Sequence, residues 1–598
     1  MSFTKGVLYP CNPATTRGEP TKLSSSKDKV VYTNGRSVIV KLVQDAAVAT
    51  AYAGHVHPAT VARIAPSGYY CASADTSGTV RIWDTVGEDQ TLKGEYKVIS
   101  GRVKDLEWDG ESKRIIAVGD GRDKFGHAFM MDTGSSTGDI IGHSKTINAV
   151  SIRHQRPFRA ATAADDGSIV FHQGTQHHIS RIRELTIKTH TKFVQDVRFS
   201  PSGDHFASVG SDFKIFVYDG KTGETVGEFT DSPHTGSIMA CSWSPDSKSL
   251  ATSAADCTVK LWDVETKKAQ VTWTLGSGVN HQQVGNTWTE GDSIVSLSMS
   301  GDLNVFDKRV GDKPAHVLYG PQKAITAALP TASSTFIVGT ADGRVLQHDD
   351  SGYEYVAGDA HATLVAGLGA SQDGKVYSVG LDDRLREIEG KSYTPASFST
   401  SAQPKSVAVG GDSTVFVLET DSIEAVRSNQ KVFDLALKYT PSAIAAAGNV
   451  VAVGGEDQKV RLYSWDGKSL TESATLDGNK GVVSALAFSP NGGLLASGDS
   501  SGKIVLYDVK ERKTVTSRWS FHSGRIHSLA WTADGKHCAS GSLDTHVYVW
   551  SVEKPMKNVA IKNAGPGGVN AVFWLGEKEL ASAGADGCVR RWSVTFHA

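Results

Sequence analysis

The 598-residue sequence predicts an all-β protein in which one short unit occurs fourteen times. Three observations carry this prediction. Runs of β-branched residues are short and are separated by turn residues, which is typical of strands. Long stretches with helical periodicity are absent from the sequence. A similar unit returns about every 43 residues, which matches the length of a four-stranded propeller blade.

Each unit follows the same order. A histidine opens it, and Val or Ile follows four residues later, as at His190 and Val194. Next come a strand, a turn such as "FSPSGD" (199–204), a strand of small residues, an Asp turn and a strand that ends in Trp-Asp or a relative. The Asp turns lie near residues 34, 75, 123, 166, 212, 256, 300, 342, 382, 412, 457, 499, 544 and 586. Fourteen matches in phase indicate WD40 repeats.

A buried polar relay explains why these residue types recur. The histidine, a Ser or Thr of the second strand, the turn Asp and the Trp of the third strand can hydrogen-bond in sequence, and buried polar groups require such partners. We therefore interpret these residues as structural rather than catalytic. The predicted relay residues are His57, Asp75 and Trp83 in one unit, His234, Ser253, Asp256 and Trp262 in a second, and His522, Ser540, Asp544 and Trp550 in a third.

Fourteen units must be divided, because a propeller typically has about four to eight blades. The sequence predicts two seven-bladed WD40 β-propellers in tandem, an N-terminal one over residues 11–320 and a C-terminal one over 321–598. The third strand of the last unit ends at Val594, and only "TFHA" remains. We expect the N-terminal strand, residues 1–10, to cross over and complete that blade, which removes an exposed strand edge. The alternative assigns all of residues 1–45 to the second propeller.

Composition and charge exclude several classes of function. The net charge is about −2 and basic runs are absent, which argues against nucleic acid and against anionic lipid as partners. The six cysteines are scattered without a CxxC pair, and no apolar run approaches the roughly 18 residues of a membrane span. We expect a soluble intracellular protein with buried thiols and no metal or other cofactor.

Three short motifs suggest catalysis or metal binding only at first sight. "GDSSG" (498–502) matches a nucleophile elbow, but that elbow needs a strand-to-helix turn, and here it occupies the Asp turn between two strands. The pairs His177-His178 and His55/His57 have no Cys or carboxylate at ligand spacing. We expect a protein that is not an enzyme. A propeller enzyme with a site in its central channel would need convergent ionisable residues that the pattern does not show.

Several copies of the unit depart from the plain pattern in a distinctive way. They are "VVYTNGRSVIV" (30–40), "APSGYYCASADTSGTVRIWDT" (65–85), "VGDGRDKFGHAFMMDTGSS" (118–136), "QRPFRAATAADDG" (155–167), "HTKFVQDVRFSPSGDHFAS" (190–208) and "GGEDQKVRLYS" (454–464). These stretches resemble the actin-interacting protein 1 family, the WD-repeat partners of cofilin. The resemblance spans the chain and is patchier around 390–440. It implies a cytoplasmic, monomeric protein of the actin cytoskeleton that binds actin filaments decorated by ADF/cofilin, promotes their disassembly and caps barbed ends.

The stretch "VGDGRDKFGHAFMMD" (118–132) contains four residues that a plain unit lacks. Because Asp132 follows Asp123 by nine positions, as in "DTSGTVRIWD", we align Asp123 with Asp75 and treat Gly-Asp-Gly-Arg as a loop insertion. That loop, the turn of the next unit and the loop opening the following one should meet on one rim. The predicted interface residues are Arg122, Asp123, Phe125, Asp165, Lys192 and Phe193. By resemblance this rim matches the actin-contacting surface of the family.

Other interpretations remain open at this point. The inserted residues can simply reshape a turn, and Phe193 can pack under a loop. The segment "GTQHHISRIREL" (174–185) lacks the aromatics that the family usually has there, which leaves Arg181 and Arg183 as its contacting candidates. The competing function is that of a general WD40 scaffold or adaptor for another assembly, because fold alone does not decide function.

Overall fold

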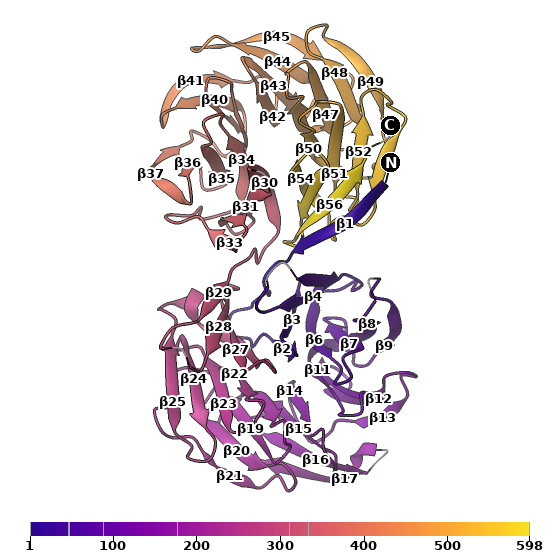
Figure 1. Cartoon of the computed structure of the whole chain (residues 1–598), viewed down its shortest axis with the longest axis vertical. Coiled ribbons are helices and arrows are strands. Elements are labelled where there is room, and N and C mark those ends of the chain that lie inside the picture. The colour runs from indigo at the N-terminus through magenta and orange to yellow at the C-terminus, as the bar shows by residue number, and fades with distance from the viewer. Residues whose placement is uncertain are drawn as a thin grey trace. The chain divides into compact units, whose positions relative to one another are not determined.

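The computed structural model describes residues 2–45, 48–87, 89–175, 178–309, 311–332 and 334–596. These residues form 56 strands in fourteen four-stranded antiparallel sheets, with one short 3₁₀ helix, η1 (Val279–His281). The predicted fold is confirmed: the chain is all-β and consists of two tandem seven-bladed WD40 propellers (Figure 1).

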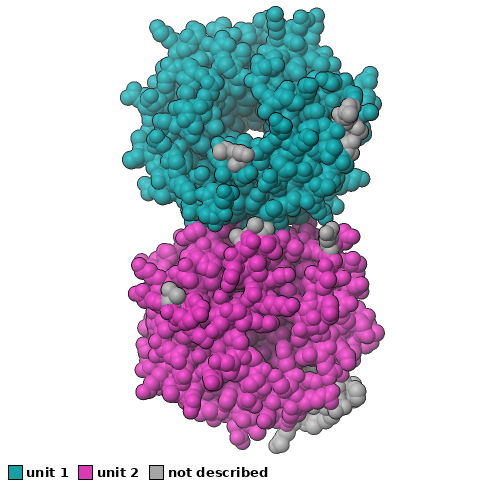
Figure 2. Space-filling model, in the orientation of Figure 1, with its two compact units in different colours: residues 1–11, 323–598 teal, residues 12–322 magenta. Residues whose placement is uncertain are grey.

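The chain divides into two compact units (Figure 2). The first ring is Asn12–Gln322, and the second ring is Met1–Cys11 together with Lys323–Ala598. Cys11, which we had placed in the first propeller, belongs to the second, because its backbone N–H donates to Cys588 Sγ at 3.3 Å. Residues 321 and 322 likewise belong to the first ring, where the Asn12 N–H donates to the Pro321 carbonyl.

The first ring contains blades 1 to 7, each an antiparallel sheet of four successive strands. The strands are β2 (Ser24–Ser26), β3 (Lys29–Asn34), β4 (Ser37–Leu42) and β5 (Ala49–Tyr52) in blade 1; β6 (Ala59–Ile64), β7 (Tyr70–Asp75), β8 (Thr79–Asp84) and β9 (Leu92–Lys97) in blade 2; β10 (Gly101–Trp108), β11 (Arg114–Gly121), β12 (Gly126–Met130) and β13 (Ser136–Asp139) in blade 3; β14 (Ile147–Ile152), β15 (Arg159–Ala164), β16 (Ile169–Thr175) and β17 (His178–Ile187) in blade 4; β18 (Val194–Phe199), β19 (His205–Gly210), β20 (Ile215–Asp219) and β21 (Thr225–Glu228) in blade 5; β22 (Ile238–Trp243), β23 (Ser249–Ala254), β24 (Thr258–Asp263) and β25 (Ala269–Thr274) in blade 6; and β26 (Gln283–Trp288), β27 (Ser293–Ser298), β28 (Leu303–Asp307) and β29 (His316–Leu318) in blade 7.

The second ring contains blades 8 to 14, and its last blade takes a strand from the other end of the sequence. The strands are β30 (Ile325–Ala332), β31 (Thr335–Thr340), β32 (Val345–Asp349) and β33 (Gly352–Tyr355) in blade 8; β34 (Val365–Ala370), β35 (Val376–Gly380), β36 (Arg384–Glu389) and β37 (Ser392–Ser399) in blade 9; β38 (Pro404–Val409), β39 (Val415–Glu419), β40 (Ser422–Arg427) and β41 (Gln430–Ala436) in blade 10; β42 (Pro441–Ala447), β43 (Val450–Gly455), β44 (Val460–Trp465) and β45 (Leu470–Leu476) in blade 11; β46 (Val483–Phe488), β47 (Leu494–Asp499), β48 (Ile504–Asp508) and β49 (Lys513–Trp519) in blade 12; β50 (Ile526–Trp531), β51 (His537–Ser542), β52 (Val547–Ser551) and β53 (Asn558–Ile561) in blade 13; and β54 (Val569–Trp574), β55 (Glu579–Gly584), β56 (Val589–Thr595) and β1 (Ser2–Tyr9) in blade 14.

The N-terminal strand β1 lies against β56, the last strand of the chain, as the indigo and yellow arrows of Figure 1 show. The two strands are antiparallel, with Ser2 opposite Thr595 and Tyr9 opposite Val589. The Phe3 ring packs edge-on against Trp592, with ring centroids 5.8 Å apart. The backbone groups of β56 that would otherwise form an open edge are therefore paired.

The two rings differ at their centres. In the second ring the first strands of the blades surround a cavity of about 900 Å³, and Figure 2 shows the opening. Small side chains, one from each blade, make much of its wall: Ala327, Gly367, Ser406, Ala443, Ala485, Ser528 and Ala571. The charged lining residues that the structure describes are Lys405 and Arg525.

The polar relay holds the turn of a blade to the loop that opens it. In blade 13, His522 Nδ1 lies 2.9 Å from Asp544 Oδ2, and its Nε2 lies 2.8 Å from Ser540 Oγ. The Trp550 indole donates to the same Ser540 oxygen at 2.8 Å. Blade 6 contains the corresponding bonds between His234, Asp256 and Trp262, but with a different hydroxyl residue.

That hydroxyl residue corrects one of our predictions. Thr252, not Ser253, accepts from the Trp262 indole at 2.9 Å and bonds His234 Nε2 at 2.8 Å. Successive residues of a strand point to opposite faces, so a shift of one position moves the side chain out of the relay. Ser253 instead faces blade 7, where its hydroxyl lies 2.9 Å from Ser296 Oγ.

The relay histidine of blade 2 is His55, and our prediction of His57 was wrong. His55 Nε2 lies 2.7 Å from Ser73 Oγ, and its Nδ1 lies 3.2 Å from Asp75 Oδ2, whereas His57 is exposed. Strand β6 begins at Ala59, four residues after His55, and Ala59 holds the place that Val194 and Ile238 hold in blades 5 and 6, directly before the bulge of each strand. We counted from Val61, two residues further along the strand. Burial lowers the pKa of His55, so the ring is neutral near pH 7.

Replacing His55 and His57 one at a time tests which of the two histidines belongs to the relay. We expect His55→Ala to reduce the local stability of blade 2 by about 1–3 kcal/mol, because Ser73 and Asp75 lose a buried partner. His57→Ala should change it by less than about 0.5 kcal/mol, as exposed sites usually do. Hydrogen exchange of the β7 and β8 amides measures both effects. Equal effects of the two variants would contradict the assignment.

Removal of residues 2–10 should destabilise the second ring and leave the first unchanged. The deletion leaves β56 unpaired along the ladder that β1 now fills. We expect faster hydrogen exchange over β54–β56 and normal exchange over β2–β5. Faster exchange confined to residues 22–60 would instead support the division that places residues 1–45 in the second propeller.

Candidate functional site

The unusual stretch of blade 3 both extends strand β11 and lengthens the turn that follows it. Val118 pairs with Gly126 across the turn, whereas Ala74 pairs with Val80 in blade 2. Seven residues lie between Val118 and Gly126, against five between Ala74 and Val80. The net insertion in blade 3 is therefore two residues. By this register Gly119, and not Asp123, occupies the place of Asp75. Our alignment was wrong because β12 ends at Met130, two residues before the Asp132 on which the alignment relied.

The additional glycines let the tip of this hairpin close tightly. A Cβ atom on Gly119 would lie 2.0 Å from the Arg102 carbonyl oxygen, and one on Gly121 would lie 1.9 Å from that of Lys124. No other residue fits such an approach. The turn at Arg122 and Asp123 is consequently raised to the rim, and both side chains are exposed. Backbone N–H groups of Asp123 itself and of Ser100 lower the pKa of the Asp123 carboxyl, which therefore stays ionised.

A chain of hydrogen bonds, here called the rim network, joins the rims of blades 3, 4 and 5. Thr146 Oγ1 donates to Asp120 Oδ1 at 3.1 Å, and the Thr146 carbonyl accepts from the Asp165 N–H at 3.0 Å. Asn148 Nδ2 then donates to Asp165 Oδ1 at 2.7 Å and to the Val194 carbonyl at 3.0 Å. The network brings the turn of blade 4 to the loop of Phe193.

Two exposed aromatic rings stand beside the rim network. Phe193 is 47% exposed and Phe213 is 39% exposed, so neither is needed to fill the core. Lys192 Nζ lies 5.5 Å from the centroid of the Phe213 ring, which is a cation–π distance. With Lys192 and the Asp165 carboxylate, which the rim network ties to the loop of Phe193, these rings form a surface that combines aromatic and charged groups, as protein interfaces do.

Phe213 is a candidate rim residue that the sequence pattern missed. It has φ +69°, a left-handed conformation that an aromatic residue rarely adopts, and glycine stands directly after the turn Asp in other blades, at Gly167 and Gly343. Cys257, Gln458 and Thr545 adopt the same conformation directly after the turn Asp of their blades, so the turn requires it and only the exposed aromatic side chain distinguishes Phe213. A phenylalanine after a turn Asp, in "SDFK", was therefore an available signal.

The remaining predicted residues divide into two groups. The Phe125 ring is only half-buried, but it packs against the apolar cluster of Val118, Ile140 and Ile147 and so supports the rim from below. Arg181 and Arg183 belong to a segment, residues 174, 175 and 178–184, whose side chains lie outside the described part of the chain. Residues 176 and 177 lie outside it altogether.

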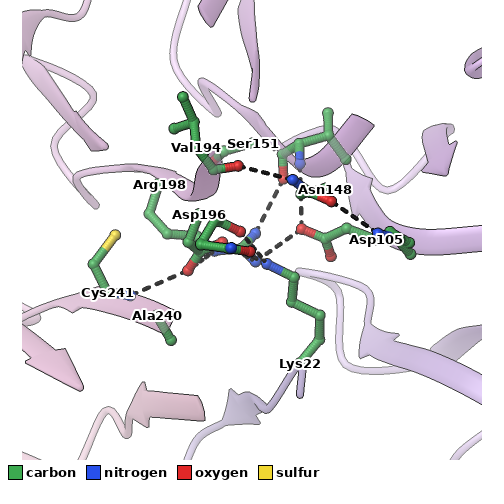
Figure 3. A network of polar contacts seen from close by, with 12 residues as sticks. Lys22, Asp105, Asn148, Ser151, Val194, Asp196, Arg198, Ala240 and Cys241 are labelled. Atoms are coloured by element: carbon green, nitrogen blue, oxygen red, sulfur yellow. Dashed lines mark hydrogen bonds and ion pairs between the residues drawn. The ribbon is translucent and has the colours of Figure 1, made fainter. Parts of the chain in front are cut away.

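A buried ion cluster lies beneath the rim network (Figure 3). Arg198 Nη2 contacts Asp105 Oδ2 at 2.8 Å and Asp196 Oδ1 at 2.9 Å, so it joins blades 3 and 5. Lys22 Nζ contacts Asp196 Oδ1 at 2.8 Å, and Arg63 Nη2 contacts Asp105 Oδ1 at 3.0 Å, which adds blades 1 and 2. We call these five residues the first-ring ion cluster.

The charges of the first-ring ion cluster are maintained by one another. Burial alone would raise the pKa of the Asp105 carboxyl, but Arg198 and Arg63 outweigh it and hold the pKa well below its usual range. Burial lowers the pKa of Lys22, and Asp196 opposes that shift. Because each buried charge depends on its partners, the cluster fixes the relative positions of the blades that supply them.

Within the described part of the chain, no group of three or more His, Cys, Asp or Glu side chains is arranged to hold a metal ion. Among the same residues, no helix has the length and apolarity to cross a bilayer. The features that the first ring does offer are a rigid base and an aromatic, charged rim.

Comparisons with known proteins agree with this architecture. The WD domain, G-beta repeat family matches residues 48–84, 182–219, 223–263 and 513–551, and the anaphase-promoting complex subunit 4 WD40 domain matches 447–524. A protein of Drosophila melanogaster named actin-interacting protein 1 is 38% identical over 98% of this chain and 97% of its own. The protein of that name from Caenorhabditis elegans is 37% identical over 99% and 100%. WD repeat-containing protein 1 of Gallus gallus is 38% identical over 95% and 94%.

The rim network can be tested through Asn148. We expect Asn148→Ala to speed hydrogen exchange at residues 165–167 and 192–195 by about 5- to 100-fold, because removal of a buried hydrogen-bonding group costs about 1–3 kcal/mol locally. Thr60→Val is the matched control, since Thr60, like Asn148, is the second residue of the first strand of its blade but donates to Ala74 of its own blade. Unchanged exchange in Asn148→Ala would show that the network does not hold the rim.

Proposed function

This chain belongs to the actin-interacting protein 1 family, and on that premise we propose that it binds actin filaments and cooperates with ADF/cofilin to disassemble them. The protein is an actin-related WD-repeat protein, since relatives named for actin interaction match it over nearly its full length. In this proposal it acts as a monomer in the cytoplasm, at the actin cytoskeleton, without catalysing a reaction.

The rim of blades 3 to 5 is the proposed actin-contacting surface. The observation that carries this choice is the pair of exposed aromatic rings, Phe193 and Phe213, flanked by charged side chains. Aromatic residues that lose water on binding usually supply most of the energy of an interface. Because Asn148 and Arg198 hold the rim from beneath, little ordering entropy is lost when a partner binds.

Preferential binding explains how a protein without catalytic groups promotes disassembly. A ligand shifts an equilibrium only by the difference between its affinities for the two states. If the rim binds a cofilin-decorated filament tenfold more tightly than a bare one, it favours the decorated state by about 1.4 kcal/mol for each bound site. A ring that remains bound at a barbed end also blocks addition of the next subunit.

The double variant Asp123→Ala with Phe193→Ala tests the surface. We expect it to fold normally and to lose cofilin-dependent filament disassembly, with a binding loss of up to about a thousandfold if two hot spots of about 2 kcal/mol each add. Co-sedimentation with filaments, with and without cofilin, measures binding, and microscopy measures disassembly. Circular dichroism and thermal melting check the fold.

A matched variant controls for the loss of an aromatic and an acidic residue. Tyr69→Ala with Asp132→Ala removes two exposed side chains from blades 2 and 3, in turns at the other ends of the strands. It should bind and disassemble filaments normally. Normal disassembly by the folded rim variant would show that the actin site lies elsewhere, and failure of the unaltered protein to co-sediment would favour a scaffold or adaptor role.

A further inference from the structure

Closure of the second ring brings together two cysteines that are 577 residues apart. Cys11 follows β1, and Cys588 immediately precedes β56, the strand with which β1 pairs. The Cys11 N–H donates to Cys588 Sγ at 3.3 Å. Both residues are fully buried, and neither is in a disulfide.

The backbone around the pair leaves the two side chains in contact. Gly587 has φ +71°, and a Cβ placed on it would lie 3.1 Å from Cys11 Cβ. Cys11 therefore packs directly on the turn that carries Cys588. The Cys588 thiol, which hydrogen-bonds that of Cys11, raises the pKa of Cys11, and burial raises it further. In the closed ring Cys11 is thus a protonated thiol.

A buried cation stands beside the two sulfurs. Arg590 contacts Asp586 at 2.5 Å through Nη2, but its Nη1 is buried and has no hydrogen-bond partner among the described residues. The charge of Arg590 favours the thiolate form of Cys11. A thiolate that forms here therefore lies beside a cation whose Nη1 can still donate a hydrogen bond. Thiolates are the reactive species in disulfide exchange.

We propose that Cys11 and Cys588 form a reversible disulfide when the protein meets a low-molecular-weight disulfide such as oxidised glutathione. One cysteine thiolate attacks a sulfur of glutathione disulfide, forms a mixed disulfide and expels one glutathione thiolate. The thiolate of the other cysteine then attacks the protein sulfur of the mixed disulfide and expels the second glutathione. Two protein thiols are oxidised, and one glutathione disulfide is reduced to two glutathione molecules.

Access to the thiols comes through opening of β1. This strand pairs only with β56, and five of its eight residues are exposed. Terminal strands with few buried contacts open locally far more often than the whole ring unfolds. Oxidation occurs in the opened form, and the disulfide then links β1 covalently to the last blade. This inference depends on the topology of the second ring and not on the proposed binding of actin.

The test uses the full-length protein and oxidised glutathione. After incubation in native buffer, remaining thiols are alkylated and the protein is digested without reduction. We expect mass spectrometry to show the peptide of Cys11 linked to the peptide of Cys588, and dithiothreitol to remove the link. Hydrogen exchange over β1 and β56 should be at least tenfold slower in the oxidised protein than in the reduced one.

Two variants complete the test. Cys588→Ser should abolish the link, whereas Cys257→Ser, which removes a cysteine in blade 6, should retain it. The wild-type peptide map decides the question even if Cys588→Ser fails to fold. The proposal is overturned if the folded wild-type protein shows only separate glutathione adducts on the two cysteines, no modification of either, or a link that forms only in denaturant.

Discussion

Ring closure is the constraint on which both halves of the chain depend. A four-stranded blade buries its two faces only when a neighbour covers each of them, so the first and last blades of a ring must meet. In the first ring two separate sheets meet, and Ser25 Oγ donates to the Trp288 carbonyl at 2.7 Å. In the second ring blades 8 and 14 also meet as separate sheets, where Asn570 Nδ2 donates to the Ile325 carbonyl at 2.8 Å. There β1 in addition completes the ladder of β56, so closure depends on a strand that is distant in sequence.

The centres of the rings show two ways to fill the space inside seven blades. The first ring places charged side chains there, and Arg198 joins the carboxylates of two blades. Charges taken out of water contribute little net stability, but they define where each blade must lie. The second ring has small side chains around an open cavity of about 900 Å³. The exposed rings of Phe193 and Phe213 therefore belong to the ring with the more constrained interior.

Local patterns allowed the repeat, the number of blades and most relay residues to be predicted from the sequence. The errors arose where a register had to be known. The relay histidine is His55 because the four-residue spacing starts from Ala59, the first residue of β6, and strand alternation places Thr252 rather than Ser253 in the relay. Asn148 carries no sequence signal at all, because its partners lie in other turns and in the next blade.

The pairing of β1 with β56 also dictates an order of events during synthesis. The first ring uses only contiguous strands, β2 to β29, and can close while the ribosome still works on the remainder. The partner of β1, strand β56, is made roughly half a minute to two minutes later at about 5–20 residues per second. Throughout that interval β1 is an unpaired edge, which invites pairing with other chains. Lys5, Gly6 and the polar residues Ser2 and Thr4 make the waiting strand a poor template for aggregation. The nascent chain thus carries one finished propeller and one that cannot be completed until β56 has been made.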